Sequence, residues 1–90
     1  MPDSCFVYVL GSVKDGVGKT YVGWTNDLDK RLAAHNGGTG AKSTRGRVWV
    51  ILHTESFKTR GEAMSREWHL KRDRKFRKKL LETFLSEGTA

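Results

Sequence analysis

Five residues of this 90-residue chain carry side chains that could act together on a phosphodiester. They are the phenols of Tyr8 and Tyr21, the guanidinium of Arg31, the imidazole of His35 and the carboxylate of Glu67. An arginine can stabilise the charge of a phosphorane, a phenol or imidazole can move the protons of water, and a carboxylate can hold a divalent cation. These residue types suit phosphodiester hydrolysis, provided that the fold brings them around one hollow.

Glu67 is the most informative of the five, because helical spacing places it on a stripe with Ala63 and Leu70. Burying an unpaired carboxylate is costly, so Glu67 needs a cation. Lys71 one turn later, Arg31 or a divalent metal could supply it, and helix spacing alone favours the pair with Lys71. Mg²⁺ keeps several waters and takes only one or two protein carboxylates, so a single glutamate remains compatible with a metal site.

Other kinds of site find little support in the sequence. Taken singly, strand tyrosines usually pack in a core. One cysteine and three histidines show no zinc-ligand spacing, and His53 and His69 are expected to be surface or packing residues. Residues 13–20 and 37–43 come close to a phosphate-binding loop but lack its strand-loop-helix context. Hydrolysis through a nucleophilic serine is disfavoured too, because no serine lies in an elbow-type glycine pattern.

The first half of the chain predicts a hairpin followed by a helix. Residues 5–10 are apolar on both faces, which predicts a central strand, and residues 12–18 supply the turn to a second strand at 20–25. Tyr21 and Gly23 share a face, and the glycine leaves room for a ligand or another backbone. Tyr8 joins that face if the register allows.

Helix and strand signals continue to the end of the chain. We expect a helix at 26–36 capped by Thr25 or Asn26, with Arg31 beside His35, then an exposed basic loop at 37–47 and a third strand at 48–57. A capping box formed by Thr59 and Glu62 predicts a helix to about residue 72, and Asp73 can cap a last basic helix. Residues 1–3 and 86–90 are expected to fray.

Composition indicates one soluble domain with an affinity for polyanions. Lysine plus arginine number 17 against 10 acidic residues, a formal charge of +7, which makes nucleic acid the leading partner class. The lone Cys5 excludes an internal disulfide and is expected to be a buried thiol. The apolar runs are too short for a membrane span or signal peptide, so we expect a cytoplasmic protein with no membrane partner.

Four segments, in this order, resemble the GIY-YIG nuclease domain. Val7-Tyr8-Val9 stands at the GIY position, Tyr21-Val22-Gly23 at YIG, residues 27–36 match the arginine helix, and Arg66-Glu67-Trp68 matches the metal-binding glutamate. The chain resembles the small stand-alone (UPF0213) members, and residues 42–47 are also similar to the nuclease subunit of structure-selective endonucleases. Valines replace the Gly and Ile of the first motif and the Ile of the second, while Ser43 and Trp49 stand where small members often have Tyr and Pro.

The resemblance implies a single α+β domain over residues 1–90, with a core at 4–72 and a basic helix at 73–86. Its expected order is β-β-α-β-α-α, with a three-stranded antiparallel sheet covered by helices. It implies a metal-dependent DNA endonuclease or exonuclease that leaves 5′-phosphate and 3′-hydroxyl ends, with structure-selective cleavage in DNA repair or recombination as one expected role.

The resemblance also assigns roles to the five residues. Tyr8 would activate water, Tyr21 and His35 would support proton transfer, Arg31 would bind the scissile phosphate, and Glu67 would hold one Mg²⁺ or Mn²⁺. The residues expected to hold the substrate are Lys42, Thr44, Arg45, Arg47 and Lys71, with the last helix extending the phosphate track. The alternative is a non-catalytic nucleic-acid-binding module that acts with a protein partner, and a weaker one is an RNA-binding protein.

Overall fold

The computed structural model describes residues 4–88, which form one antiparallel sheet with helices on both faces. The elements are β1 (Cys5–Lys14), β2 (Val17–Thr25), α1 (Leu28–Asn36), the 3₁₀ helix η1 (Lys42–Thr44), β3 (Val50–Phe57), α2 (Arg60–Arg72) and α3 (Arg74–Gly88). The sheet order is β2-β1-β3, and both pairs are antiparallel. The predicted α+β class, the order β-β-α-β-α-α and the central place of the first strand are confirmed.

The hairpin between β1 and β2 is tighter than predicted. Lys14 pairs with Val17, so the turn consists only of Asp15 and Gly16, whose φ angles are 53° and 77°. Two successive positive φ angles give a two-residue turn whose twist matches that of the strands, and Asp-Gly tolerates both. The longer strands fix the register that the sequence left open.

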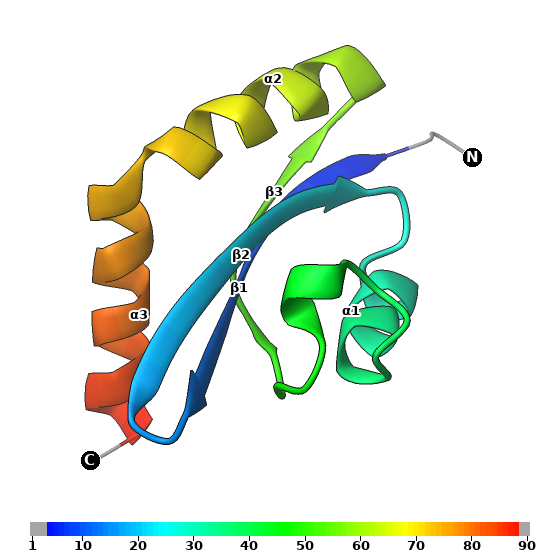
Figure 1. Ribbon diagram of the computed structural model, residues 1–90. Helices are drawn as coiled ribbons and strands as arrows, with labels where there is room; N and C mark the ends of the chain where they lie inside the picture. The colour runs from blue at the N-terminus through cyan, green and yellow to red at the C-terminus, as the bar shows by residue number, and fades with distance from the viewer. Residues whose placement is uncertain (1–3, 89–90) are drawn as a thin grey trace.

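Helices cover the two faces of the sheet in two separate layers. Figure 1 shows α2 and α3 along one face and α1 with η1 on the other. Val7, Val9 and Val22 pack with Ala63 and Leu70 of α2 in one core. The second core lies on the opposite face and contains Tyr8, Leu10 and Trp49, with Leu28 and Leu32 of α1 packed against them. β1 is thus covered on both sides, as its apolar residues predict.

The helix caps agree with the sequence in two cases out of three. Glu62 N donates to the hydroxyl of Thr59 at 3.2 Å, and Phe76 N donates to the carboxylate of Asp73 at 3.1 Å, which confirms both predicted caps. The first helix is capped by Asp27, whose Oδ1 accepts from Lys30 N at 3.1 Å, and not by Thr25 or Asn26. Thr25 instead accepts a hydrogen bond from Asp27 N, so its hydroxyl orders the turn before the cap.

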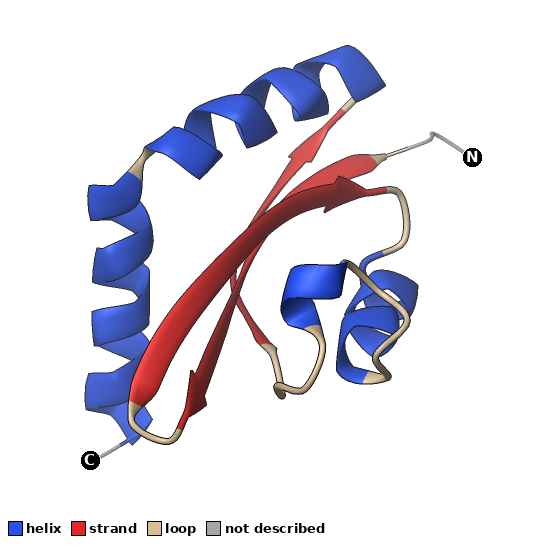
Figure 2. Cartoon of the chain, viewed as in Figure 1, coloured by secondary structure: helices blue, strands red, loops and turns tan. Residues whose placement is uncertain are grey.

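Residues 37–47 are not the uniformly exposed loop that the sequence predicts. They include η1, which lies beside α1 (Figure 2), and Thr44 in it is fully buried. Trp49 is also buried, because its indole N–H donates to Thr44 O and its backbone N–H donates to Asn36 Oδ1. These contacts hold Trp49 out of the sheet, and β3 begins at Val50 instead of residue 48.

Residues 86–88 continue α3 instead of fraying, whereas residues 1–3 and 89–90 lie outside the described residues. Cys5 is a buried free thiol, as predicted. Among the residues that the structure describes, none of the helices has the length and apolar character to cross a membrane.

Candidate active site

A hydrogen bond between two buried side chains lies at the centre of the α1 layer. The Tyr8 hydroxyl is 3.0 Å from His35 Nε2, and the two residues are 2% and 0% exposed. Tyr8 comes from the central strand and His35 from the last turn of α1. Because both groups are removed from water, this bond is electrostatically stronger than one at the surface.

Two glycines make room for this pair. Gly23 lies directly opposite Tyr8 in the sheet, and a Cβ there would sit 2.7 Å from Cζ of the Tyr8 ring and closer still to its oxygen. The space that the sequence offered to a ligand or another backbone is therefore occupied by Tyr8 itself. Gly40 packs against His35 in the same way, since a Cβ at Gly40 would lie 2.5 Å from His35 Nδ1.

Tyr21 and Arg31 flank the buried pair on its partly exposed side. Leu10 pairs with Tyr21 and Tyr8 with Gly23, so the two tyrosines share one face, as predicted for a matching register. The Tyr21 ring centroid lies 4.8 Å from that of His35 and 6.4 Å from that of Tyr8. Arg31 is one turn before His35 on α1. Hydrogen bonding with Tyr8 is the main cause that raises the pKa of its guanidinium.

The surroundings keep the central pair uncharged at neutral pH. Burial raises the pKa of the Tyr8 phenol, with Tyr21 and Glu67 adding to the effect, and the Arg31 side chain opposes it. Burial also lowers the pKa of His35, and the charge of Arg31 lowers it further. A neutral phenol thus faces a neutral imidazole, which can accept a proton through one ring nitrogen.

Glu67 lies on α2, the helix on the other face of the sheet. Its carboxylate lies 3.7 Å from Lys71 Nζ, with side-chain exposures of 21% and 52%, so the predicted pair exists but is loose. The pKa of Arg31 is raised chiefly by hydrogen bonding with Tyr8. The Glu67 carboxylate nevertheless acts electrostatically on the Tyr8 phenol.

Hydrogen bonds between β3 and α2 hold Arg66, the residue before Glu67. The neighbouring Arg66 donates Nε to Glu55 Oε1 at 2.9 Å and Nη2 to Glu55 Oε2 at 3.0 Å. His53 Nε2 lies 2.7 Å from the same carboxylate, and the His53 ring stacks edge-on against Phe76. The hydrogen bonds with Arg66 are the main cause that lowers the pKa of Glu55, and the hydrogen bond with His53 lowers it further. The hydrogen bonds of Arg66 fasten α2 to β3 at the residue before Glu67.

The donor set fits a divalent cation held by few protein ligands. Residues 4–88 contain no cluster of three or more His, Cys, Asp or Glu side chains that could enclose a metal ion. Glu67 is partly exposed and its carboxylate is only loosely engaged by Lys71. One accessible carboxylate with several waters and substrate oxygens is a coordination that Mg²⁺ accepts.

The predicted substrate residues divide into two groups. Lys42, Arg45 and Lys71 are exposed. Arg47 instead donates to Ser12 and to Val17 O, which fastens the loop to the hairpin. Thr44 is 0% exposed and hydrogen-bonded to His35, so a phosphate cannot reach its hydroxyl. The contact of Thr44 with His35 was missed from the sequence, where no periodicity marks residues 37–47.

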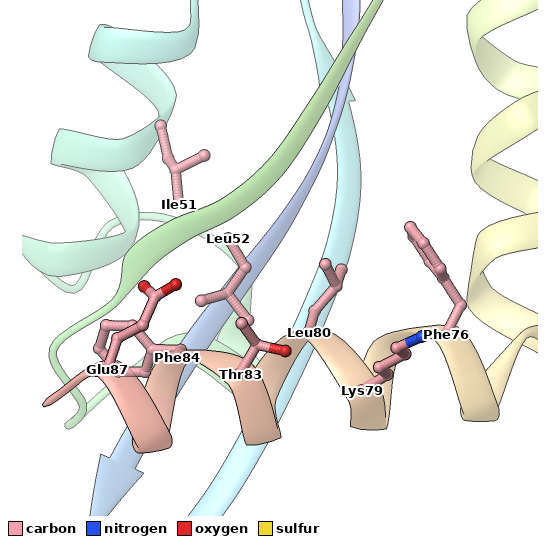
Figure 3. Close-up of a pocket in the computed structure, with 8 residues that line it drawn as sticks. All are labelled: Ile51, Leu52, Phe76, Lys79, Leu80, Thr83, Phe84 and Glu87. Carbon is pink, nitrogen blue, oxygen red and sulfur yellow. The ribbon is translucent and has the colours of Figure 1, made fainter. Parts of the chain in front are cut away.

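A separate hollow of about 400 Å³ lies between β3 and α3. Figure 3 shows Leu52, Leu80 and Phe84 between these two elements, and Ile51 on the same strand directed to the other side. The hollow contains none of the five residues considered above. Its mainly apolar lining offers no arrangement for acid-base chemistry.

The sheet, the paired tyrosines and the arginine helix define a GIY-YIG catalytic domain. The family model for that domain matches residues 4–80, and the chain belongs to the GIY-YIG family. Among its relatives are proteins named only as UPF0213. Those of Clostridium perfringens, Bacillus licheniformis and Halobacterium salinarum are 46%, 44% and 52% identical to it, covering 74%, 96% and 72% of this chain and 70%, 88% and 82% of theirs. No solved structure matches significantly.

Replacing Gly23 by alanine should disrupt the central hydrogen bond. The added methyl would overlap the Tyr8 ring, and overpacking of this kind costs about 1–3 kcal/mol. We expect Gly23→Ala to lower the free energy of unfolding by that amount in urea denaturation. Gly61→Ala is the matched control, because a Cβ at Gly61 meets no atom within 4 Å. Equal urea midpoints for the two variants would contradict the packing described.

Proposed function

We propose that the protein is a divalent-metal-dependent nuclease that hydrolyses DNA phosphodiester bonds and leaves 5′-phosphate and 3′-hydroxyl ends. The observation that carries this proposal is the buried hydrogen bond between Tyr8 and His35, with Arg31 and Tyr21 beside it. Membership of the GIY-YIG family, whose matching model is that of a catalytic domain, supports the same conclusion.

In the proposed reaction, Tyr8 and His35 move the proton of the attacking water. The water transfers a proton to the Tyr8 oxygen as the Tyr8 proton passes to His35 Nε2, 3.0 Å away. The resulting hydroxide attacks phosphorus, the bond to the 3′ oxygen breaks, and the released 3′ oxyanion takes a proton from solvent water to become the 3′-hydroxyl. The low pKa of His35 keeps its imidazole neutral and ready to accept at neutral pH. Because Tyr8 is buried, the water must approach along Tyr21 and Arg31, which are only partly buried.

Arg31 and Glu67 serve the charge of the phosphate in this proposal. The guanidinium of Arg31, next to Tyr8, would bind the scissile phosphate and stabilise the phosphorane. Glu67 would hold Mg²⁺ or Mn²⁺, and the ion when bound would neutralise negative charge on the phosphate oxygens.

The DNA would be held by positive side chains around the site. The side chains of Lys42, Arg45 and Lys71 are exposed. In the sequence, the first two follow His35 and the third follows Glu67, and α3 adds exposed lysines and arginines. Because the protein carries a net charge of +7, its affinity for DNA should fall steeply as the salt concentration rises. Branched DNA of the kind formed in repair and recombination is the substrate we propose to test first.

Glu67→Ala should abolish Mg²⁺-dependent cleavage and leave binding intact. Labelled branched, single-stranded and duplex DNA, with RNA for comparison, would be incubated with wild type and variant in Mg²⁺ and in EDTA. Glu82→Ala, which removes an exposed carboxylate on α3, is the matched control and should cut like wild type. Undiminished cleavage by Glu67→Ala would contradict the proposed metal site.

The same panel distinguishes the alternative functions. A salt-sensitive shift of every DNA without any cut by the wild-type protein would favour a binding module. Preferential binding of RNA would favour an RNA-binding protein.

The buried neutral His35 should make stability depend on pH. A histidine in the unfolded chain has a pKa of about 6.5, and the pKa of His35 in the folded protein is lower. The contribution of His35 to the free energy of unfolding is therefore complete above the unfolded pKa. It is lost as the pH falls through about 6.5 toward the lowered pKa of His35, because the unfolded chain binds the proton more readily. Urea unfolding from about pH 8 to 5 should show this slope in wild type and in His69→Gln, whose histidine is exposed. A slope that is unchanged in His35→Gln would contradict the assignment.

A further inference from the structure

We propose that Thr44 is a positioning residue that holds the proton of His35 on Nδ1 and thereby leaves Nε2 to accept the proton of Tyr8. Thr44 is fully buried and its hydroxyl bonds to His35, so it would act only through the imidazole. The inference rests on the proposed nuclease function for its catalytic consequence, whereas the tautomer that it assigns to His35 stands independently of that function.

The direction of the hydrogen bonds follows from two distances. Thr44 Oγ1 lies 2.7 Å from Ala41 O and 2.9 Å from His35 Nδ1. Two oxygens at 2.7 Å need a proton between them, and a carbonyl has none to give, so the hydroxyl of Thr44 donates to Ala41 O. Toward His35 the hydroxyl oxygen can then only accept, which places a proton on Nδ1. The neutral imidazole has one N–H, so Nε2 is an acceptor and the Tyr8 hydroxyl must donate to it.

The fold holds Thr44 in this position from several sides. Its backbone N–H donates to Ala41 O at 2.9 Å in the turn of η1, and its carbonyl accepts from the Trp49 indole at 2.8 Å. Gly40 allows this turn to lie against His35, because a Cβ there would be 2.9 Å from the His35 Cα. The threonine side chain is therefore fixed before any substrate binds, and a hydroxyl with a single orientation can select a single tautomer.

Loss of the hydroxyl would remove the partner of Nδ1. The imidazole could then carry its proton on Nε2, pointing at Tyr8, and the phenol would become the acceptor. In that state Tyr8 has no base to receive its proton when it takes one from water. For imidazoles that bind metals, removing the group that orients the ring typically costs about 10–100-fold in affinity or activity, and we expect a loss of cleavage rate of the same order.

The test compares Thr44→Val, which keeps the shape but lacks the hydroxyl, with Thr44→Ser, which keeps the hydroxyl. ¹⁵N NMR of the histidine rings at about pH 8, where histidines are neutral, reports which nitrogen is protonated, and His35→Gln identifies the His35 signals. Wild type and Thr44→Ser should show protonated Nδ1, and Thr44→Val should shift His35 toward protonated Nε2. Protonated Nε2 in wild type, or an unchanged tautomer in Thr44→Val, would overturn the inference.

Cleavage of the DNA panel in Mg²⁺ then tests the consequence. We expect Thr44→Val to lose about 10–100-fold in rate and Thr44→Ser to retain the wild-type rate, with urea midpoints checking that each variant is folded. A changed tautomer with an unchanged rate would overturn the positioning role. If wild type cuts no substrate, the nuclease proposal fails, while the NMR result still decides the tautomer. Should Thr44→Val not fold, the wild-type and Thr44→Ser spectra alone decide it.

Discussion

A phenol and an imidazole can share the interior of a small domain only if each of their polar atoms has a partner. Tyr8 and His35 satisfy one another, and Thr44 satisfies the second nitrogen of the ring. Among residues 4–88, no buried side-chain nitrogen or oxygen is left without a partner. The surroundings are built to fit this arrangement. Gly23 and Gly40 leave room for the two rings, and the buried Trp49 donates to the carbonyl of Thr44 in the turn of η1.

The same requirement separates the two candidate functions. A net charge of +7 suits binding of nucleic acid by a module of either kind, so charge alone cannot choose between them. Binding alone gives no reason to bury a titratable pair whose pKa values are moved in opposite directions, Tyr8 upward and His35 downward. Such pairs cluster at sites of proton transfer, which is why we favour chemistry over binding alone.

Local sequence patterns predicted the elements well, because their causes are local. A run of residues that is apolar on both faces marked the central strand, and the capping residues Thr59 and Asp73 fixed two helix starts. The errors arose where distant residues decide the outcome. Competition among Thr25, Asn26 and Asp27 for one cap could not be settled from the sequence, since all three types are good caps. The register that places Tyr8 opposite Gly23 depends on the length of the hairpin turn. Because of that register, the Tyr8 ring fills the space beside Gly23 that was expected to admit a ligand.

The site shows the same division. Helix spacing correctly predicted that Lys71 lies near Glu67 and placed Arg31 one turn from His35. No pattern in residues 37–47 predicts that the Thr44 side chain points inward to His35. The most direct measurement of the central claim is the rate of Mg²⁺-dependent DNA cleavage by Tyr8→Phe, which keeps the ring against Gly23 and removes only the hydroxyl. The account predicts a loss of about 100-fold or more, the scale of general acid-base catalysis, in a variant that folds like wild type. Cleavage at the wild-type rate by that folded variant would contradict it.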